Sequence, residues 1–233
     1  MAGTIVESAF DLLDKWRHLP SYQLERRADI FFAVYLPEFL SDHLGLKINP
    51  LVIPEFPVKI EVEEGANPIF ASNKIDYLAI AQNQSCALFI ELKTDCGSRR
   101  DGQDAYLVSA QKKGLSALLA DIIEIAQKSS AKQKYAQLIL LAAALGLIDA
   151  PPELAARAKV PNARGLGAEF RKTKPSVHAA MPIKILYLQP TGDSGNVITF
   201  AAFAKWLKTK KDPIADRFGQ SLLQWCSTAG CPS

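Results

Sequence analysis

The sequence contains few of the residues that build metal sites from histidine and cysteine. Its 233 residues include 3 histidines and 4 cysteines, and neither set has the close spacing of zinc ligands. The cysteines are Cys86, Cys96, Cys226 and Cys231. A histidine-based zinc hydrolase is therefore not indicated, and we expect reduced thiols in a cytoplasmic protein. A disulfide between Cys226 and Cys231 is the alternative.

Long apolar runs are also missing. A membrane-spanning helix needs about 20 consecutive apolar residues, and the longest apolar run here, residues 138–148, is nearer to a buried helix. The first residues carry acids instead of the basic and then apolar pattern of a secretory signal. We therefore expect neither secretion nor a membrane partner. The chain also lacks a Gly-rich phosphate loop and a Gly-x-Ser-x-Gly elbow.

The chain does have the composition of an ordinary globular protein, with 48% hydrophobic and 22% charged residues. This composition predicts a single domain over residues 1–233 with a sizeable core. Within it we expect N-terminal helices in residues 1–45, the core in residues 55–190, and a C-terminal strand and helices in residues 191–233.

Positive charge is concentrated in one stretch of the chain. The net charge is +3, but residues 151–211 hold 11 Lys and Arg against 3 Asp and Glu, which gives +8. Such an excess can neutralise the phosphates of a nucleic acid, although a solvated surface explains it equally well. Residues 155–182 contain few apolar side chains, so we expect this part to be partly disordered and able to close over a nucleic acid.

The hydrophobic periodicity predicts strands alternating with helices, and therefore an α/β fold with a central mixed sheet flanked by helices. Helices are expected at 4–16, 22–36, 103–125, 132–147, 201–207 and 214–226, and strands at 58–62, 75–80, 86–93, 183–189 and 197–200. Ser21 is the expected N-cap of the second helix. Pro37 should kink or restart this helix, and continuation past Pro37 to residue 43 is the alternative. Three prolines predict an irregular connector between residues 45 and 57.

Two of the expected strands carry the residues that point to a function. The strand at 75–80 has Asp76 near its beginning, and the strand at 86–93 ends in Glu91-Leu92-Lys93. The polar linker 81–85 between them is short enough for an antiparallel hairpin, which would bring Asp76 near Glu91. Side chains alternate along a strand, so Glu91 and Lys93 are expected on one face.

Two carboxylates gathered in this way repel each other unless a divalent cation lies between them. Hard oxygen ligands of this kind suit Mg²⁺ or Mn²⁺. A lysine beside such an ion can orient a water molecule or stabilise negative charge that develops on a phosphate. The alternative is that Glu91 and Lys93 are solvated groups at a strand end, because Glu-x-Lys triplets are common.

The segment after Lys93 adds two further features. Residues 94–102 form a polar loop that contains Arg99 and Arg100, whose forked donors suit phosphate contacts. The following helix begins near Gln103, and Tyr106 lies three residues later, so the two side chains are neighbours on the helix. An amide and a phenol beside the acids could hold a water, a phosphate or the lysine.

This order of features resembles the PD-(D/E)XK nuclease superfamily, and within it the RecB-like and related branches with Gln and Tyr on the helix after the lysine. The resemblance covers residues 25–113, with Ile75 where many members have proline. It implies a restriction-endonuclease-like core and a Mg²⁺- or Mn²⁺-dependent nuclease, with DNA as the expected substrate. A fold member that binds nucleic acid without cleaving it is the alternative, as is an unrelated α/β protein.

The resemblance also implies a role for each candidate residue. Asp76, Glu91 and the backbone carbonyl of Leu92 would hold the metal, and Lys93 would position the attacking water. An upstream helical acid would assist, for which Glu25 is the first choice and Glu38 the alternative. Gln103 and Tyr106 would support these groups. The residues that would contact the nucleic acid are Arg99, Arg100, Lys172 and Lys174. A homodimer is compatible with the sequence.

Overall fold

The computed structural model describes residues 4–59, 72–94, 101–160 and 165–227, with the backbone alone for residues 72, 101–103 and 227. Contacts divide the chain into two compact units. The first unit comprises residues 1–50, 90–103 and 185–233, and the second comprises residues 51–89 and 104–184. In the described ranges, no helix is long and apolar enough to cross a membrane.

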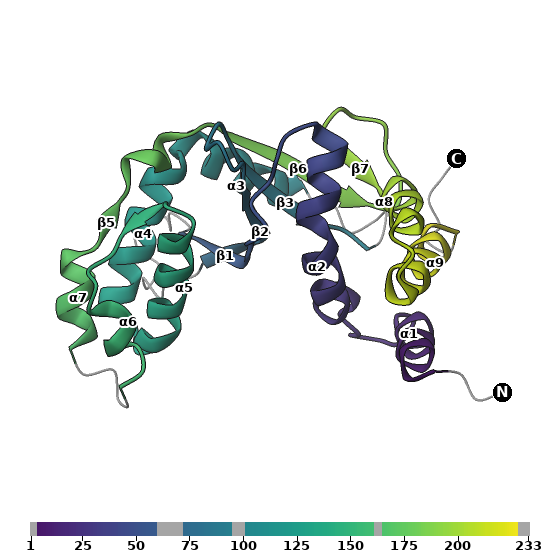
Figure 1. Ribbon diagram of the computed structural model, residues 1–233, viewed down its shortest axis with the longest axis horizontal. Coiled ribbons are helices and arrows are strands. Elements are labelled where there is room, and N and C mark those ends of the chain that lie inside the picture. The colour runs from purple at the N-terminus through teal and green to yellow at the C-terminus, as the bar shows by residue number, and fades with distance from the viewer. Residues whose placement is uncertain (1–3, 60–71, 95–100, 161–164, 228–233) are drawn as a thin grey trace. The chain divides into compact units, whose positions relative to one another are not determined.

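A five-stranded sheet with the strand order β1-β2-β3-β6-β7 runs through the fold. The strands are β1 (Ile53–Lys59), β2 (Ser72–Ile80), β3 (Ala87–Leu92), β6 (Ile183–Gln189) and β7 (Val197–Thr199). β1 pairs with β2 antiparallel, whereas β6 pairs with β7 parallel. The expected α/β class with a mixed sheet flanked by helices is therefore confirmed (Figure 1).

The first strand begins earlier than the sequence pattern predicted. We expected a connector up to residue 57 and a strand at 58–62, but β1 already includes Pro54 and Pro57. Proline lacks the N–H that a central strand must donate, so it is tolerated mainly at sheet edges. β1 is an edge strand and pairs with β2 alone, which explains why it accommodates both prolines. Residues 60–62 lie outside the described ranges.

The second unit contains several helices (Figure 1). They are α3 (Asp101–Lys113), which begins in the first unit, α4 (Leu115–Lys128), α5 (Lys132–Ala144), α6 (Leu154–Arg157) and α7 (Leu166–Lys172). The single helix predicted at 103–125 is wrong, because α3 and α4 are separate. Gly114 divides them with φ of +84°, a conformation that glycine adopts without steric cost.

The basic segment 155–182 is folded over residues 155–160 and 165–182, which corrects the expectation of disorder for these residues. Besides α6 and α7 it contains β5 (Lys174–Pro175), which pairs with β4 (Ile148–Asp149), and a 3₁₀ helix at Val177–Ala180. Its few apolar side chains are well spaced: Leu166 and Phe170 lie one helical turn apart and are both fully buried. Residues 161–164 lie outside the described ranges.

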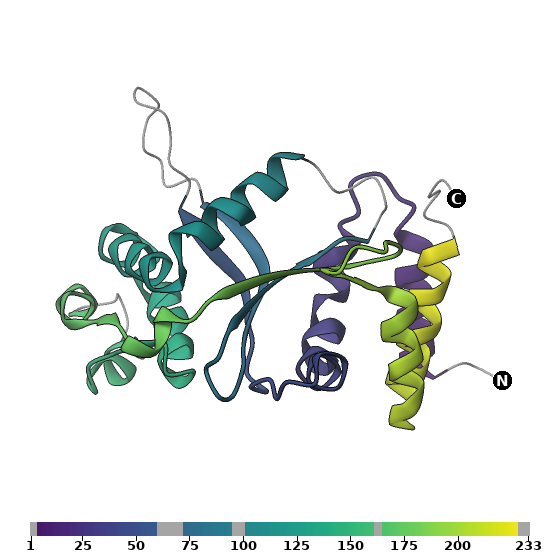
Figure 2. The ribbon, with the colours of Figure 1, turned by 90° about the horizontal axis from the view of Figure 1, so that it is seen from above.

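The first unit contains α1 (Ile5–Trp16), α2 (Leu24–Leu44), α8 (Phe200–Leu207) and α9 (Pro213–Ser227). α8 and α9 lie alongside each other in both ribbon views (Figures 1 and 2). An aromatic cluster joins the helices, and its central members are Phe10, Phe32, Phe203 and Phe218. The helix expected at 4–16 is confirmed, and Thr4 and Glu7 form a capping box at its start.

The second helix differs from its prediction at its start, whereas the alternative of continuation past Pro37 is confirmed. Its N-cap is Gln23, whereas the predicted cap Ser21 lies before the helix with φ of +62°. The helix continues through Pro37 to Leu44 instead of restarting. An interior proline costs about 3 kcal/mol or more, but Phe32, Leu36, Phe39 and Leu40 are almost fully buried on either side of it. Burying such side chains contributes about 1.5–3 kcal/mol each, enough to offset that cost.

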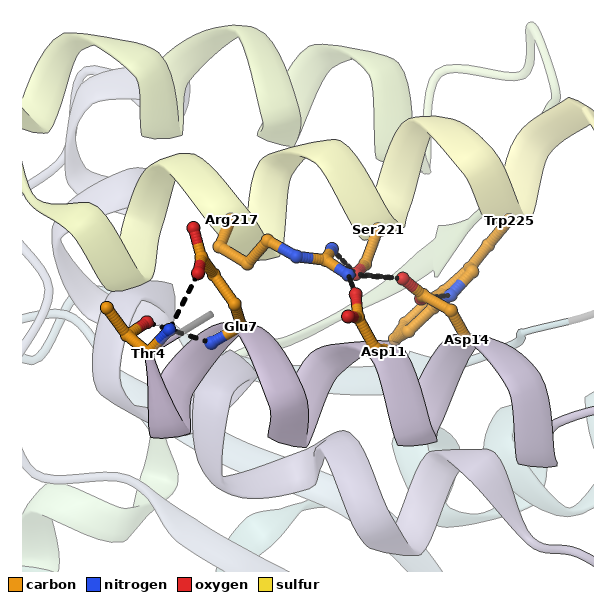
Figure 3. Close-up of polar contacts among 7 residues, drawn as sticks. All are labelled: Thr4, Glu7, Asp11, Asp14, Arg217, Ser221 and Trp225. Carbon is orange, nitrogen blue, oxygen red and sulfur yellow. Dashed lines mark hydrogen bonds and ion pairs between the residues drawn. The ribbon is translucent and has the colours of Figure 1, made fainter. Parts of the chain in front are cut away.

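A buried acid joins the two terminal helices of the first unit (Figure 3). Asp14 on α1 accepts hydrogen bonds from three side chains of α9. The donors are Arg217 Nη2 at 2.9 Å, Ser221 Oγ at 3.0 Å and Trp225 Nε1 at 2.7 Å. Asp14 is 7% exposed and Trp225 is fully buried. The network therefore fixes the position of α1 against α9.

Cys86 and Cys226 form no disulfide with each other or with another described residue, and Cys86 is buried. Cys226 Sγ donates a hydrogen bond to the carbonyl oxygen of Pro190 at 3.4 Å, and burial raises the pKa of its thiol. Cys231 lies outside the described ranges, so the alternative disulfide between Cys226 and Cys231 stays a prediction.

Tyr35 on α2 is expected to ionise at higher pH than other tyrosines. Burial, the hydrogen bond from its hydroxyl to the Asp212 carboxylate, and the charge of that carboxylate hold the pKa of Tyr35 well above its ordinary value. Unfolded chains lose the phenol proton near pH 10, so this contribution to stability is complete below that pH and is lost at higher pH. In an ultraviolet titration of wild type, Tyr35 should be the last tyrosine to ionise as the pH rises. The Tyr35→Phe variant should lack this last ionisation. Loss of an early-titrating phenol would contradict the contact.

Candidate functional site

Glu91 and Lys93 meet at the end of β3. Lys93 Nζ lies 2.8 Å from Glu91 Oε1, and the side chains of Lys93 and Glu91 are only 8% and 4% exposed. The expected placement of both on one face is confirmed by this contact, since residues two apart in a strand point the same way. The backbone N–H of Lys93 donates to the carbonyl oxygen of Leu188 at 2.9 Å, which ties this end of β3 to β6.

Burial removes one of the alternatives for this pair. A solvated Glu-x-Lys at a strand end would be exposed, whereas Glu91 and Lys93 are both buried. Taking two charges out of water costs several kcal/mol per ion, and their mutual attraction recovers that cost only with good geometry. Leu92 between them is buried as well. The pair is therefore a desolvated ion pair.

The upstream acids lie in different surroundings on α2. The Glu25 carboxylate, in the first turn, accepts a hydrogen bond from the hydroxyl of Thr94, the residue that follows Lys93. Glu38 instead forms an ion pair with Lys210 Nζ at 2.6 Å and is well exposed. Glu25 is thus the acid that contacts the segment carrying the Glu91–Lys93 pair. Sequence reasoning missed Thr94, whose only signal was its position next to Lys93.

Asp76 and Tyr106 belong to the second unit. Asp76 is half-buried in β2, and the Tyr106 hydroxyl on α3 donates to the carbonyl oxygen of Lys74 at 3.2 Å, two residues before Asp76. The Lys74 ammonium group pairs with Glu55 on β1. Tyr106 therefore contacts the strand that carries Asp76, and its supporting role stays a prediction.

The turn that leads from β2 to β3 is tight. The N–H of Ala81 donates to the carbonyl oxygen of Cys86 at 3.1 Å, and Gln84 adopts φ of +55° within the turn. Because β2 and β3 are neighbours in the sheet and so short a connection reverses the chain, they form the expected hairpin. The approach of Asp76 to Glu91 stays a prediction, since the two residues belong to different units.

Of the remaining candidates, Arg99 and Arg100 lie outside the described ranges. Gln103 lies in the first turn of α3, where the structure describes the backbone alone. Lys172 and Lys174 each approach an acid, with Nζ at 3.1 Å from Glu169 Oε2 and at 3.9 Å from Asp149 Oδ2 respectively. Their charges are therefore partly compensated, and their contact with a nucleic acid stays a prediction.

The described acids of the site do not by themselves form a complete set of ligands for a divalent cation. Among the described residues, no group of three His, Cys, Asp or Glu side chains is close enough to hold a metal ion together. Mg²⁺ is often bound through only one or two carboxylates, with water and substrate phosphates as further ligands. The Glu91 carboxylate and the Leu92 carbonyl are oxygen donors of the kind that Mg²⁺ prefers, so the donor chemistry fits such an ion.

Neither a scan with protein-family models nor searches of curated proteins and of solved structures found a match to this chain.

Proposed function

We propose that this protein is a Mg²⁺-dependent nuclease that hydrolyses phosphodiester bonds, with DNA as substrate. The observation that carries the proposal is the desolvated Glu91–Lys93 pair at the end of β3, beside the contact between Thr94 and Glu25. The order of motifs in the sequence, which resembles the PD-(D/E)XK superfamily, supports the same function. We propose in addition that the fold has a restriction-endonuclease-like core.

Burial of the pair supports a functional role because stability does not account for it. Replacing a buried ion pair by apolar side chains is often neutral or stabilising, so such a pair is weak evidence for a stabilising role. Charged groups that are desolvated beside a specific partner are characteristic of active sites. Glu91 and Lys93 are such groups, and they are the two residues that the sequence motif singles out.

Each residue has a definite task in the proposed mechanism. Asp76, Glu91 and the carbonyl of Leu92 would hold the ion, with Glu25 assisting. Bound Mg²⁺ would polarise the phosphoryl group and stabilise the leaving oxygen. An ammonium group has three donors, so Lys93 can keep its contact with Glu91 while it orients a water molecule towards the phosphorus. Tyr106 and Gln103 would support these groups, and Arg99 and Arg100 would contact the backbone of the DNA.

The test combines Mg²⁺ titration by calorimetry with plasmid nicking, on wild type, Glu91→Gln and Asp76→Asn. Mg²⁺ binding and nicking should both be lost in the two variants. Asp149→Asn is a matched control, because Asp149 is an exposed acid whose partner is Lys174, and it should behave as wild type. DNA binding that is unaffected by Mg²⁺, with no nicking by any of the four proteins, would instead favour the non-catalytic alternative.

Glu25 and Glu38 make a second, independent comparison. Glu25→Gln is expected to reduce nicking about tenfold or more. The substitution removes the negative charge of a side chain that contacts Thr94, next to Lys93. Glu38→Gln should not reduce it, since Glu38 pairs with Lys210. The measurement is the initial rate of nicking at saturating Mg²⁺. Equal losses in both variants, or a loss in Glu38→Gln alone, would refute the assignment of Glu25 as the upstream acid.

A further inference from the structure

The end of α8 carries a group of exposed lysines that the sequence analysis did not single out. α8 ends at Leu207 and is followed by the 3₁₀ helix η3 (Lys208–Lys210). Lys205, Lys208 and Lys211 are all exposed. We call these three residues the lysine surface. Lys205 and Lys208 lie three residues apart and are therefore neighbours on the helical face.

Acids close to this surface are already bound to other groups. Glu38 pairs with Lys210, whose ammonium also lies 3.9 Å from the centre of the Trp206 ring. Asp42 accepts a hydrogen bond from Trp206 Nε1 at 2.7 Å, and Asp212 accepts one from the Tyr35 hydroxyl. Lys210 is thus the one lysine of the segment 205–211 with an acidic partner among the described residues. The lysine surface thus has no ion-pair partner among the described residues, although Asp42 and Asp212 keep their charges because their hydrogen-bond donors are neutral.

This arrangement differs from that of the lysines in the second unit. Lys59, Lys113 and Lys128 each form an ion pair with a carboxylate, of Glu124, Asp121 and Glu124 respectively. A lysine contributes most to phosphate binding when it has no competing carboxylate, because the salt dependence of binding reflects the phosphates that are actually neutralised. The lysine surface meets this condition and the three paired lysines do not.

We propose that the lysine surface binds the phosphate backbone of duplex DNA. The inference rests on the proposed nuclease function and adds the residues that hold its substrate. Glu38, which holds Lys210, lies about 20 Å along α2 from Glu25, at the rise of an α-helix. The surface therefore contacts DNA away from the reacting phosphate, and it acts on substrate binding and not on the chemical step.

A purely structural role gives a different expectation. Lysines near the end of a helix interact favourably with the negative end of its dipole and so support the helix. If this were their only role, replacing them would lower the thermal stability slightly and leave DNA binding as it is. Measurements of both stability and DNA binding separate the two roles.

The test uses the triple variant Lys205→Gln, Lys208→Gln, Lys211→Gln. The matched control is Lys59→Gln, Lys113→Gln, Lys128→Gln, whose lysines form ion pairs with carboxylates. Both variants remove three positive charges from the full chain. The probe is a fluorescein-labelled duplex of about 30 base pairs, titrated without divalent ions between about 50 and 200 mM salt. Fluorescence anisotropy gives the Kd at each salt concentration, and plasmid nicking with Mg²⁺ gives KM and kcat.

The slope of log K against log salt is expected to become shallower by about 2–3 in the lysine-surface variant, at about 0.9 for each phosphate that is no longer neutralised. Its Kd at the lowest salt should rise at least about tenfold, and KM should rise while kcat is unchanged. The control should be affected clearly less on both measures. Equal weakening in the two variants, or no DNA binding by wild type, would overturn the inference.

These outcomes are distinguishable from failure of the proposed function. DNA binding that depends on the lysine surface, without nicking by wild type, would support this inference and overturn the nuclease. Nicking that requires Glu91, with equal salt slopes in all three proteins, would support the nuclease and overturn the lysine surface.

Discussion

Replacing Lys93 with methionine is expected to abolish Mg²⁺-dependent nicking and also to destabilise the fold. Methionine has a similar length but no charge, so the Glu91 carboxylate would remain buried without the ammonium that now lies 2.8 Å away. Removing one partner of a buried ion pair typically costs about 3–5 kcal/mol. Loss of a group that positions the attacking water should reduce the rate about a hundred- to ten-thousand-fold. Urea unfolding and plasmid nicking measure the two effects.

The double variant Glu91→Gln, Lys93→Met separates stability from catalysis. With both charges removed, no ion is left buried without a partner, so the double variant should be more stable than Lys93→Met alone. The coupling energy from the double-mutant cycle is expected to be about 1–3 kcal/mol. Nicking should stay absent, because the groups that hold the metal and the water are missing.

Each result of that cycle has a clear meaning. A stable but inactive double variant would assign the pair to catalysis and not to folding. Full nicking by the double variant would refute the catalytic roles of Glu91 and Lys93. A Lys93→Met protein as stable as wild type would contradict the desolvated state of the pair, whatever its activity.

Replacing Asp14 with alanine is expected to lower the free energy of unfolding by about 3–5 kcal/mol. Asp14 accepts hydrogen bonds from Arg217, Ser221 and Trp225, so its removal leaves several buried donors without their acceptor. The effect is large because Asp14 and Ser221 are buried, and water cannot readily replace the missing carboxylate. Urea or thermal unfolding, with the Trp225 fluorescence as the probe, measures this change.

Asp11→Ala is the matched control for this prediction. Asp11 lies on the same helix and also pairs with Arg217 Nη2, at 2.6 Å, but its side chain is 72% exposed. An exposed ion pair contributes at most about 1 kcal/mol, so Asp11→Ala should change the stability little. Similar destabilisation in both variants would show that burial of the network does not determine its strength.

Local signals predicted several elements well. The strand at 183–189 and the helix at 4–16 are marked by continuous periodicity, and both are confirmed. The hairpin turn after β2 is confirmed for the same reason, because its polar residues lie between two apolar runs. Such features depend on residues close together in the chain.

Elements whose form depends on distant partners were predicted less well. Pro54 and Pro57 suggested a connector, and only the position of β1 at the sheet edge makes them compatible with a strand. Pro37 left a stop and a continuation of the helix both open, and the buried side chains around it keep α2 continuous. Gly114 was hidden within a long apolar pattern, and its positive φ separates α3 from α4.

The sequence by itself determined the α/β class and the position of Glu91 and Lys93 on one strand face. It also limited the candidates for the upstream acid to Glu25 and Glu38. Only the tertiary structure decided that this pair is buried, that Glu25 and not Glu38 contacts the adjoining Thr94, and which lysines lack an acidic partner among the described residues. Side-chain alternation is a local property of the backbone, so a sequence reveals it. Burial and ion pairing depend on what packs against a residue from distant parts of the chain, as the contact of Asp14 with Trp225 illustrates.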